Sequence, residues 1–530
     1  MKRISFILIT ILSLIVISCK EEEEDIPQIE PKVTISLSGY ELSFEQGGSE
    51  SLYIISGISE SYISPSDFKV TDNNGDTFNF VEITEAEITD DNTISLVFTD
   101  TRTSSDNNKY HEEVYLVYIP SGIKSDRPII MSSSTYMPVV YITTSVSQNS
   151  INKTTWTEGK IKIDGGGDYE DLEEMVCEIK GRGNSTWSWE KKPYAIKLES
   201  KKEVLGMPKH KRWCLIANYM DRTHLRNRVA YHISEHSGLD YTTRNRFVEL
   251  YFNGNYQGLY LLTEQIKVDK NRVNIEELSQ TDNSDDVITG GYLLEFDTNY
   301  DEDKKFYANA TSIPVNLKYP DAEDISDAQW TYIRNFINNL DSRFNGLMNG
   351  RNTLDYIYEN IDKKSMIDFW IVFEVMANYE VLHPKSIYFH KERNGKLVAG
   401  PVWDFDYGTL IRTSTTSWIN YNLNWRPTEF EWYERNWWNI LLMNDPEFVQ
   451  DLKARWNELY DFLVTVPDFI EEERNYISAA VNRNNKKWTT IRGTSNPNGD
   501  EALSFNAAVD RLKTVYADRV QWLGGCINGW

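Results

Sequence analysis

Two aspartates behind an apolar strand are the residues of this sequence best suited to chemistry. Asp404 and Asp406 stand two positions apart in Gly400-Pro-Val-Trp-Asp-Phe-Asp-Tyr-Gly408. In an extended backbone both carboxylates point to the same side, where a divalent cation can bridge them to phosphate oxygens. Aspartate pairs also occur as ordinary turn residues, but Trp403 and Phe405 interleave with these acids and indicate a buried side. We interpret the pair as a metal or catalytic site.

A glycine-rich turn further upstream has the composition of an anion-binding loop. Lys180-Gly-Arg-Gly-Asn-Ser-Thr-Trp187 contains two glycines, Arg182 and small polar residues that include Asn184. Backbone amides of such a loop can line a phosphate, and an arginine can add a bidentate contact. Short Gly-x-Gly turns are also common as purely structural elements, so the turn by itself leaves both interpretations open.

Three lysines and one glutamate follow this turn at positions that a nucleotide site would use. Lys192 and Lys197 lie on or beside a predicted strand, and Lys197 shares its face with Ala195. Lys191 is interpreted instead as an exposed lysine at a strand edge. Glu264 ends an apolar strand, where a carboxylate must meet a cation or water. We expect Glu264 either to order a lysine or to lie at the surface.

Other reaction classes find little support. His232 and His236 have the spacing of zinc ligands on a helix but lack the glutamate of a His-Glu-x-x-His motif. No serine stands in a Gly-x-Ser-x-Gly elbow, and the four cysteines are too scattered for a zinc site or a disulfide scaffold. The tryptophans between residues 425 and 456 could stack on sugars, although helix-spaced tryptophans more often form a core.

Composition limits the classes of partner. The 530 residues include 16 Trp, 31 Tyr and 21 Phe, so most of the chain is expected to fold. Acidic residues outnumber basic residues 80 to 55, and the net charge of −25 disfavours contact with phosphate backbones. We therefore expect no nucleic-acid partner.

The N-terminus has the pattern of a lipoprotein signal. Met1-Lys-Arg precedes an apolar run over residues 4–17, which is short for a membrane span of about 20 residues. Val16-Ile-Ser-Cys19 resembles a bacterial lipobox, whose cysteine is lipidated and becomes the first mature residue. We predict a lipoprotein signal peptide over residues 1–18, with a plain signal peptide and an incidental cysteine as the alternative.

An acidic segment follows the predicted cleavage site. Residues 19–32 carry Lys20-Glu-Glu-Glu-Glu-Asp25 and two prolines, a composition typical of a solvated tether. A lysine followed by acids at this position resembles the surface-export signal of Bacteroidetes lipoproteins. The resemblance implies a lipid anchor in the outer membrane through Cys19 and exposure at the cell surface.

Hydrophobic patterning divides the rest of the chain into two regions. Residues 33–125 contain short segments of alternating apolar and polar residues separated by turn signals, which predicts a small all-β, immunoglobulin-like sandwich. Residues 136–530 begin with strands and hairpins, including one around Asn253-Gly254 and one around Asn394-Gly395. They end in a helical, tryptophan-rich part. This order predicts an α+β domain with strands in front and helices behind.

Taken together, the motifs resemble those of the CotH kinase family, the spore-coat atypical kinases. In chain order they are Gly181-Arg-Gly-Asn-Ser-Thr-Trp187 with Lys191-Lys-Pro-Tyr-Ala-Ile-Lys197, Leu215-Ile-Ala-Asn-Tyr-Met-Asp-Arg222 with Leu225-Arg-Asn227, Tyr251-Phe-Asn-Gly-Asn-Tyr-Gln-Gly-Leu-Tyr260 leading to Glu264, and Gly400-Pro-Val-Trp-Asp-Phe-Asp406. The resemblance covers about residues 137 to 480. It implies a divergent protein-kinase-like fold that binds ATP with magnesium or manganese and phosphorylates hydroxyl groups of a protein substrate.

The resemblance also implies roles for the residues of the nucleotide site. Arg182 and Asn184 belong to the loop that would meet the phosphates. Either Lys192 or Lys197 would approach the same phosphates. Glu264 would order that lysine, as an acidic residue does in protein kinases.

The family's metal and catalytic motifs fall in the second half of the chain. Asp404 and Asp406 would hold the metal that neutralises charge on the transferred group. In the catalytic loop the family usually shows an Asn followed shortly by an Asp and a further Asn, whereas this chain reads Asn378-Tyr-Glu-Val-Leu-His-Pro-Lys-Ser-Ile-Tyr388. Glu380 is the nearest candidate for the base, and Lys385 falls at the place of the metal-binding Asn.

We therefore predict a surface lipoprotein in which a β-sandwich spacer precedes a CotH-like kinase domain. The alternative is a non-catalytic binding protein that keeps the fold and engages glycans or proteins. Nucleotide binding does not distinguish the two, whereas transfer of a phosphate does.

Overall fold

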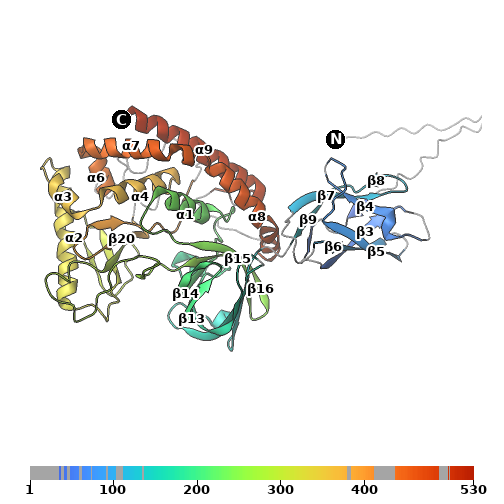
Figure 1. Cartoon of the computed structure of the whole chain (residues 1–530), viewed down its shortest axis with the longest axis horizontal. Coiled ribbons are helices and arrows are strands. Elements are labelled where there is room, and N and C mark those ends of the chain that lie inside the picture. The colour runs from blue at the N-terminus through green and yellow to red at the C-terminus, as the bar shows by residue number, and fades with distance from the viewer. Residues whose placement is uncertain are drawn as a thin grey trace, which may run out of the picture. The chain divides into compact units, whose positions relative to one another are not determined.

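The structure is a computed structural model of the whole chain (Figure 1). It describes residues 35–37, 41–44, 48–58, 62–72, 74–90, 93–102, 111–133, 137–166, 168–378, 384–410, 436–488, 499–500 and 502–530. The predicted signal peptide and tether, with Cys19, lie outside the described residues. Distances between Cα atoms divide the chain into two compact units, one with most of the residues up to 130 and one that holds residues 131–530.

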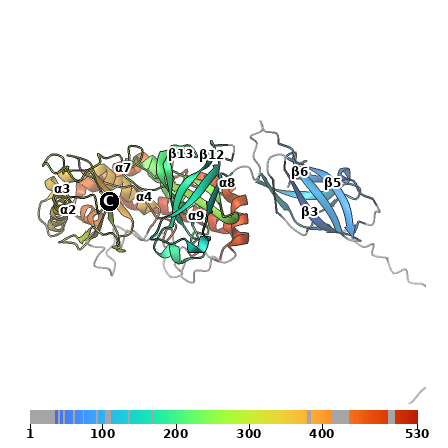
Figure 2. The same ribbon diagram turned by 90° about the horizontal axis from the view of Figure 1, so that it is seen from below.

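The N-terminal β-rich region contains two sheets. The order of the first sheet is β1 (Ile35–Leu37), β3 (Ser49–Ser56), β6 (Thr93–Asp100) and β5 (Val81–Asp90), and Figure 2 shows its last three strands side by side. The order of the second is β2 (Glu41–Phe44), β9 (Ile129–Ser133), β7 (His111–Tyr118) and β4 (Phe68–Thr71), with β8 (Ile123–Lys124) beside β7. Alternate residues of β6 are buried, as in strands with one face against a core. The predicted β-rich character is confirmed, and the immunoglobulin-like type stays a prediction.

The second unit begins with a closed barrel of seven strands. Around the barrel the order is β10 (Val139–Thr144), β11 (Thr157–Asp164), β12 (Leu172–Gly181), β13 (Tyr194–Val204), β14 (Met207–Ile216), β16 (Asn255–Glu264) and β15 (Asn245–Phe252). Tyr194, Ile196 and Leu198 belong to the core inside the barrel. Side chains alternate along a strand, so Ala195 and Lys197 face outward.

A five-stranded sheet follows the barrel in the chain. Its order is β18 (Lys305–Tyr307), β19 (Pro314–Tyr319), β17 (Tyr292–Phe296), β20 (Ile387–Lys391) and β21 (Leu397–Ala399). The β15–β16 and β20–β21 pairs are the two predicted hairpins. Asn253 and Gly254 have φ angles of 48° and 74°, which a tight hairpin turn requires. Both hairpin predictions are confirmed.

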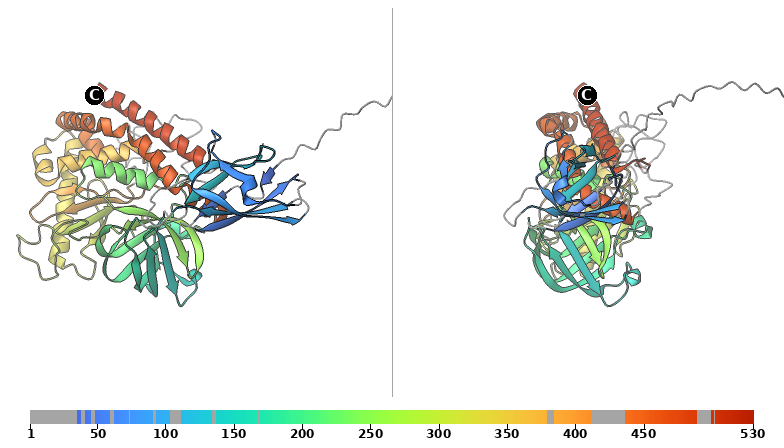
Figure 3. Two further views of the ribbon diagram at one scale, coloured as in Figure 1. Left: turned by 45° about the vertical axis from the view of Figure 1, so that its right-hand side comes forward. Right: turned by 90° about the vertical axis from the view of Figure 1, so that its right-hand side faces the viewer.

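Helices make up most of the remaining chain. They are α1 (Arg226–Ser237), α2 (Asp327–Met348), α3 (Leu354–Asn360), α4 (Lys363–Val375), α6 (Trp437–Asn444), α7 (Pro446–Leu463), α8 (Val466–Lys487) and α9 (Phe505–Gly529). In Figure 1 and the left view of Figure 3, α7, α8 and α9 form a layer along one side of the second unit, and α8 packs against β16. The predicted change from strands to helices is confirmed in outline.

The C-terminal helices enclose a large apolar core. Trp437, Trp438 and Trp456 are all buried in it, so these tryptophans are core residues. Trp425 and Trp432 lie outside the described residues. Within the described part of the chain, no helix combines the length and the apolarity needed to cross a membrane.

Candidate functional site

A cavity of about 510 Å³ lies between the barrel and the five-stranded sheet, both in the second unit. Arg182 and Asn184 line it from the loop after β12, and Cys214 lines it from β14. Asp404 and Asp406 line it from the segment after β21. The structure therefore brings the glycine-rich loop and the aspartate pair, more than 200 residues apart in the chain, to one site.

The glycine-rich loop has a shape that side chains would prevent. Gly181 ends β12, and a Cβ atom there would lie 2.6 Å from the ring of Trp187. Gly183 has φ +78°, and its Cβ atom would lie 2.0 Å from the hydroxyl of Thr186. Both glycines are thus structural requirements of a tight turn. The same turn exposes its backbone to the cavity, so the two interpretations left open by the sequence are compatible.

Arg182 is the cation of this loop. Its guanidinium carbon lies 5.4 Å from the ring centroid of Trp403, in a cation–π contact. Burial lowers the pKa of Arg182, but the acidic side chains around it, the Cys214 thiol and the Asp404 carboxyl among them, outweigh burial and hold that pKa above its ordinary value. Arg182 therefore stays charged and provides a fixed positive group facing Asp404.

Two buried asparagines hold the aspartate segment in place. The backbone amide of Phe405 donates to Oδ1 of Asn227 on α1 at 2.7 Å. The side-chain amide of Asn378, just after α4, donates to the carbonyl oxygen of Asp404 at 3.3 Å. Asp404 itself has φ +70°, an uncommon conformation for a residue other than glycine. Asn227 ends the Leu-Arg-Asn motif of the sequence, and its hydrogen bond gives that motif a positioning role.

The aspartate pair suits a cation that arrives with a phosphate. Asp406 is 3% exposed. Burial first, then the charges of Asp404 and Asp221, hold the pKa of Asp406 well above its ordinary value, with Arg182 opposing them. Magnesium commonly takes one or two carboxylates together with phosphate oxygens. In the described ranges, no three or more His, Cys, Asp or Glu side chains form a group that could hold a metal ion. The donor chemistry of the pair therefore fits magnesium or manganese.

The two lysines predicted to contact phosphates, Lys192 and Lys197, do not line the cavity. Lys192 donates to the carbonyl oxygen of Trp187 at 2.7 Å. Lys197 pairs with Glu178 at 2.6 Å on the outer face of the barrel. The structure therefore does not bring Lys192 or Lys197 to this cavity, and the expectation that one of them approaches the phosphates stays a prediction.

Lys191 requires a correction. The sequence predicts an exposed lysine at a strand edge, but Lys191 is 1% exposed and lines the cavity. Its ammonium donates to the carbonyl oxygens of Ala217, at 2.9 Å, and Leu259. These two carbonyls replace the water that an exposed lysine would bind, so the side chain can be buried.

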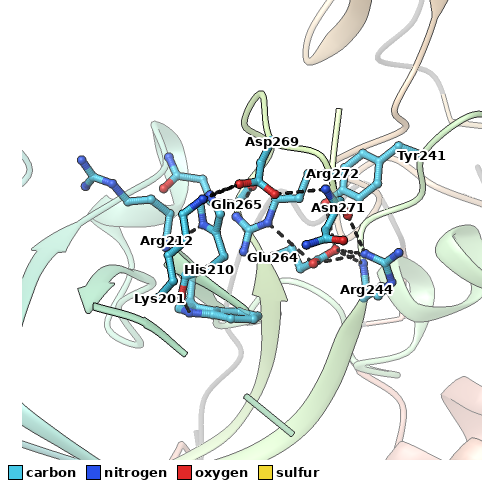
Figure 4. Close-up of polar contacts among 11 residues, drawn as sticks. Lys201, His210, Arg212, Tyr241, Arg244, Glu264, Gln265, Asp269, Asn271 and Arg272 are labelled. Carbon is cyan, nitrogen blue, oxygen red and sulfur yellow. Dashed lines mark hydrogen bonds and ion pairs between the residues drawn. The ribbon is translucent and has the colours of Figure 1, made fainter. Parts of the chain in front are cut away.

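Glu264 also has partners other than those expected (Figure 4). Its carboxylate is fully buried, and the hydroxyl of Tyr241 donates to it at 3.0 Å. The guanidinium of Arg244 lies 3.1 Å from Oε2 and Nε of Arg272 lies 3.6 Å from Oε1. Arginines therefore occupy the place in which a lysine of the nucleotide site was expected. The expected pairing with Lys192 or Lys197 is not formed.

One aspartate that lines the cavity, Asp297, was not among the site residues predicted from the sequence. Asp297 follows β17 and lines the cavity, where it accepts hydrogen bonds from the backbone amides of Asn299 at 2.6 Å and Ser386 at 3.1 Å. Burial, helped by Glu295, raises the pKa of Asp297 to about 6. The signal in the sequence is an aspartate directly after a strand of mostly apolar residues, which is similar to the pattern that singled out Asp404.

The described residues include only part of the predicted catalytic loop. Glu380 lies outside the described residues, so its candidate role as the base stays a prediction. Lys385 is described and lines the cavity, where its ammonium donates to Oδ1 of Asn299 at 3.2 Å.

Comparison with known proteins gives a family match that includes the residues of this site. The model of a family described as CotH kinase protein matches residues 179–523, against the expected range of about 137 to 480. The match begins in β12, just before the glycine-rich loop, and ends in α9, so it includes the aspartate segment. A search of curated proteins found no match.

Proposed function

This chain belongs to the CotH kinase family, and on that premise we propose that it transfers the γ-phosphate of ATP to a serine or threonine hydroxyl of a protein. One observation carries the proposal: a single cavity is lined by the glycine-rich loop with Arg182 and by Asp404 and Asp406. Phosphoryl transfer requires positive groups around the phosphates and carboxylates for a metal ion. Both are present here.

Different residues of the cavity bind different parts of ATP in this proposal. Arg182 and the backbone of its loop face the phosphates, since a fixed guanidinium and amide groups are good partners for phosphate oxygens. Ala195, Cys214 and Ile216 provide an apolar wall against which an adenine ring can pack. Asp404 and Asp406 would hold magnesium or manganese, which would supply positive charge near the transferred group.

A base has to accept the proton of the attacking hydroxyl. Family resemblance gives that role to Glu380, whose carboxylate is chemically able to perform it. Asp297 is a second carboxylate on the cavity wall. Because its pKa is about 6, most Asp297 side chains are ionised at neutral pH and can accept a proton.

We propose that the protein acts outside the cell and that a lipid anchor holds it in the membrane. Support comes from the short apolar run before Cys19 and from the acidic tether after it. A lipidated Cys19 anchors the chain in the outer membrane, and the tether exposes the folded part at the surface. The partners are then ATP, an acceptor protein and the membrane.

A second candidate function is glycan binding without catalysis. Tyr141, Tyr251 and Tyr256 form a row on the barrel, with ring centroids 5.5 Å and 5.3 Å apart along it. Tyr141 is 38% exposed. Neighbouring aromatic rings at a surface offer a platform on which sugars stack.

Transfer of labelled phosphate tests the first proposal against the second. Residues 33–530 are incubated with γ-labelled ATP, magnesium or manganese, and a panel of acceptor proteins. We expect label on protein serine or threonine, dependent on the metal and absent in a variant that carries both Asp404→Asn and Asp406→Asn. Nucleotide binding without any transfer would contradict the kinase proposal and favour the binding protein.

A further inference from the structure

A buried hydroxyl close to the aspartate pair has no role in the proposed function. Tyr231 on α1 is 1% exposed, and its hydroxyl oxygen has no hydrogen-bond partner among the described residues. Burying a hydroxyl without a partner costs free energy, so the hydroxyl of a buried tyrosine usually forms a hydrogen bond. Tyr516 on α9 shows the usual arrangement, because its hydroxyl donates to the carbonyl oxygen of Leu463 at 3.2 Å. Tyr231 therefore has a buried donor for which this arrangement provides no acceptor.

Helix α1 holds Tyr231 against the aspartate segment. Asn227 lies one turn earlier on the same face of α1, since residues four apart in a helix are neighbours. Oδ1 of Asn227 accepts a hydrogen bond from the backbone amide of Phe405 at 2.7 Å. The ring of Tyr231 contacts the ring of Trp403, with centroids 6.1 Å apart. One face of α1 thus touches the residues on both sides of Asp404.

The charges around the hydroxyl agree with this placement. Burial first, then the charge of Asp404, holds the pKa of Tyr231 well above its ordinary value, with Asp406 acting in the same direction and Arg182 against it. The phenol of Tyr231 therefore stays protonated. A protonated phenol is a hydrogen-bond donor, and a carboxylate is an acceptor.

The carboxylate of Asp404 needs such a donor. Asn378 and Asn227 hold only backbone atoms of this segment, the carbonyl of Asp404 and the amide of Phe405, and leave the carboxylate to be oriented by other groups. The carboxyl groups of Asp404 and Asp406 share a hydrogen bond, and a cation held by both of them takes the place of that bond. Carboxylates that bind metals usually accept a hydrogen bond from a further residue, which fixes their orientation.

We propose that Tyr231 is a positioning residue of the metal site, whose hydroxyl donates a hydrogen bond to the carboxylate of Asp404 when the aspartate pair holds magnesium or manganese. Tyr231 does not line the cavity, so it touches neither the nucleotide nor the acceptor. It acts through Asp404, by fixing the orientation in which that carboxylate meets the cation. The inference rests on the metal site of the proposed function and adds to it the residue that orients one of the two carboxylates.

Tyr231→Phe removes the hydroxyl oxygen and keeps the ring that contacts Trp403. The hydroxyl has no partner to lose in the protein alone, so we expect the denaturation midpoint of the variant to equal or exceed that of the unmodified protein. We expect the contribution of the cation to nucleotide affinity to fall by about tenfold to a hundredfold, the usual effect of removing a residue that orients a metal ligand. A purely structural role would lower the denaturation midpoint instead.

Calorimetric titration separates the cation from the nucleotide. ADP is titrated into each whole protein with manganese and, separately, with a chelator of divalent cations. The ratio of the two affinities, here called the manganese ratio, measures what the cation contributes. We expect the manganese ratio to fall in Tyr231→Phe while the affinity for ADP in the chelator stays the same. An unchanged ratio would overturn the inference. An equal loss of affinity under both conditions would also overturn it, because the hydroxyl would then maintain the shape of the cavity.

Tyr516→Phe is the matched control. It removes a buried hydroxyl that has a partner and whose residue does not line the cavity. We expect it to lower the denaturation midpoint and to leave the manganese ratio unchanged, the reverse of the pattern for Tyr231→Phe. If Tyr231→Phe does not fold, the inference is contradicted, since the hydroxyl then has a structural partner.

A double variant locates the contact. Asp404→Asn removes the carboxylate that Tyr231 orients, so adding Tyr231→Phe to Asp404→Asn should change the manganese ratio no further. Losses that simply add would show that Tyr231 acts elsewhere and would overturn the inference.

These outcomes are distinct from those of the kinase test. A smaller manganese ratio in Tyr231→Phe, with no phosphate transfer by the unmodified protein, would support the inference and contradict the kinase. Phosphate transfer by the unmodified protein with an unchanged ratio in the variant would do the reverse. An unmodified protein that binds no ADP, or binds it equally with and without manganese, would overturn both the inference and the metal site.

Discussion

At the scale of single residues, side-chain chemistry was readable from the sequence where the deciding neighbours are local. Asp404 and Asp406 could be identified because the alternating aromatic residues and the preceding strand lie within a few positions. The burial of Lys191 could not, because the carbonyls that hold its ammonium belong to residues 26 and 68 positions further along the chain. Non-local partners of this kind leave no pattern around the lysine itself.

Asp297 gives a prediction for stability against pH. Its pKa is about 6 in the folded protein against an ordinary value of 3.8. The folded state therefore binds this proton more tightly than the unfolded state, and stability is lost as pH rises from about 4 to about 6. The loss should be about 3 kcal/mol, since each tenfold change in proton affinity is worth about 1.4 kcal/mol.

Asp297→Asn removes this titration. The free energy of unfolding of the unmodified protein, measured by chemical denaturation, should decline relative to that of the variant between about pH 4 and about pH 7. Asp301→Asn, a change at an exposed residue that lines the same cavity, should leave the decline in place. Curves that stay parallel for Asp297→Asn would show that Asp297 does not titrate as described.

At the scale of elements, short-range signals were sufficient for hairpins and insufficient for the barrel. The β15–β16 hairpin depends on Asn253 and Gly254 within one turn. Closure of the barrel depends on the parallel pairing of β10 with β15, in which Val139 lies opposite Glu249. That pairing joins strands separated by five others in the barrel order. The cavity exists only once barrel and sheet are in place, so the sequence could name the wall residues without showing that they meet.

The glycine-rich loop gives a prediction at this scale. Gly183→Ala places a Cβ atom 2.0 Å from the hydroxyl of Thr186 at φ +78°, so the loop has to change shape. We expect nucleotide affinity, measured by calorimetry, to fall at least about tenfold, because misplaced phosphate contacts are lost. Gly254→Ala has nearly the same φ, +74°, but its Cβ atom meets nothing within 4 Å. It should lower the free energy of unfolding by about 1 kcal/mol and leave nucleotide affinity unchanged. Equal effects of both changes on nucleotide affinity would contradict a role for the loop.

At the scale of the whole molecule, each unit has its own core. Leu52, Leu96 and Phe98 are buried in the N-terminal region, whereas the two large apolar clusters of the second unit start at Met137. The sequence analysis predicted a boundary in the same region, since the short alternating strands of residues 33–125 precede the part of the chain that carries the cavity motifs. We predict that a chain starting at residue 130 folds and binds nucleotide as the longer chain does. An insoluble product, or one that nucleotide no longer protects against thermal unfolding, would contradict this.

The anchor is a further property of the whole molecule. Changing Cys19 to Ala removes the sulfur to which lipid is attached, and no other apolar run of the sequence is expected to anchor the chain. The variant should move from the membrane fraction to the soluble fraction after cell breakage. If it stays fully with the membrane, the anchor lies elsewhere in the chain.

The central claim, that Asp404 and Asp406 form the metal site of a nucleotide-binding cavity, is tested most directly by calorimetric titration of Mg-ATP. The unmodified protein, Asp404→Asn and Asp406→Asn are compared, with and without a chelator. Each change keeps the shape of the side chain and removes a charge that the metal requires, so folding should survive. We predict metal-dependent binding that falls at least about tenfold in each variant, and further in Asp406→Asn because Asp406 is the more deeply buried carboxylate. Equal binding by all three proteins would contradict the metal site, and no binding by the unmodified protein would favour the non-catalytic alternative.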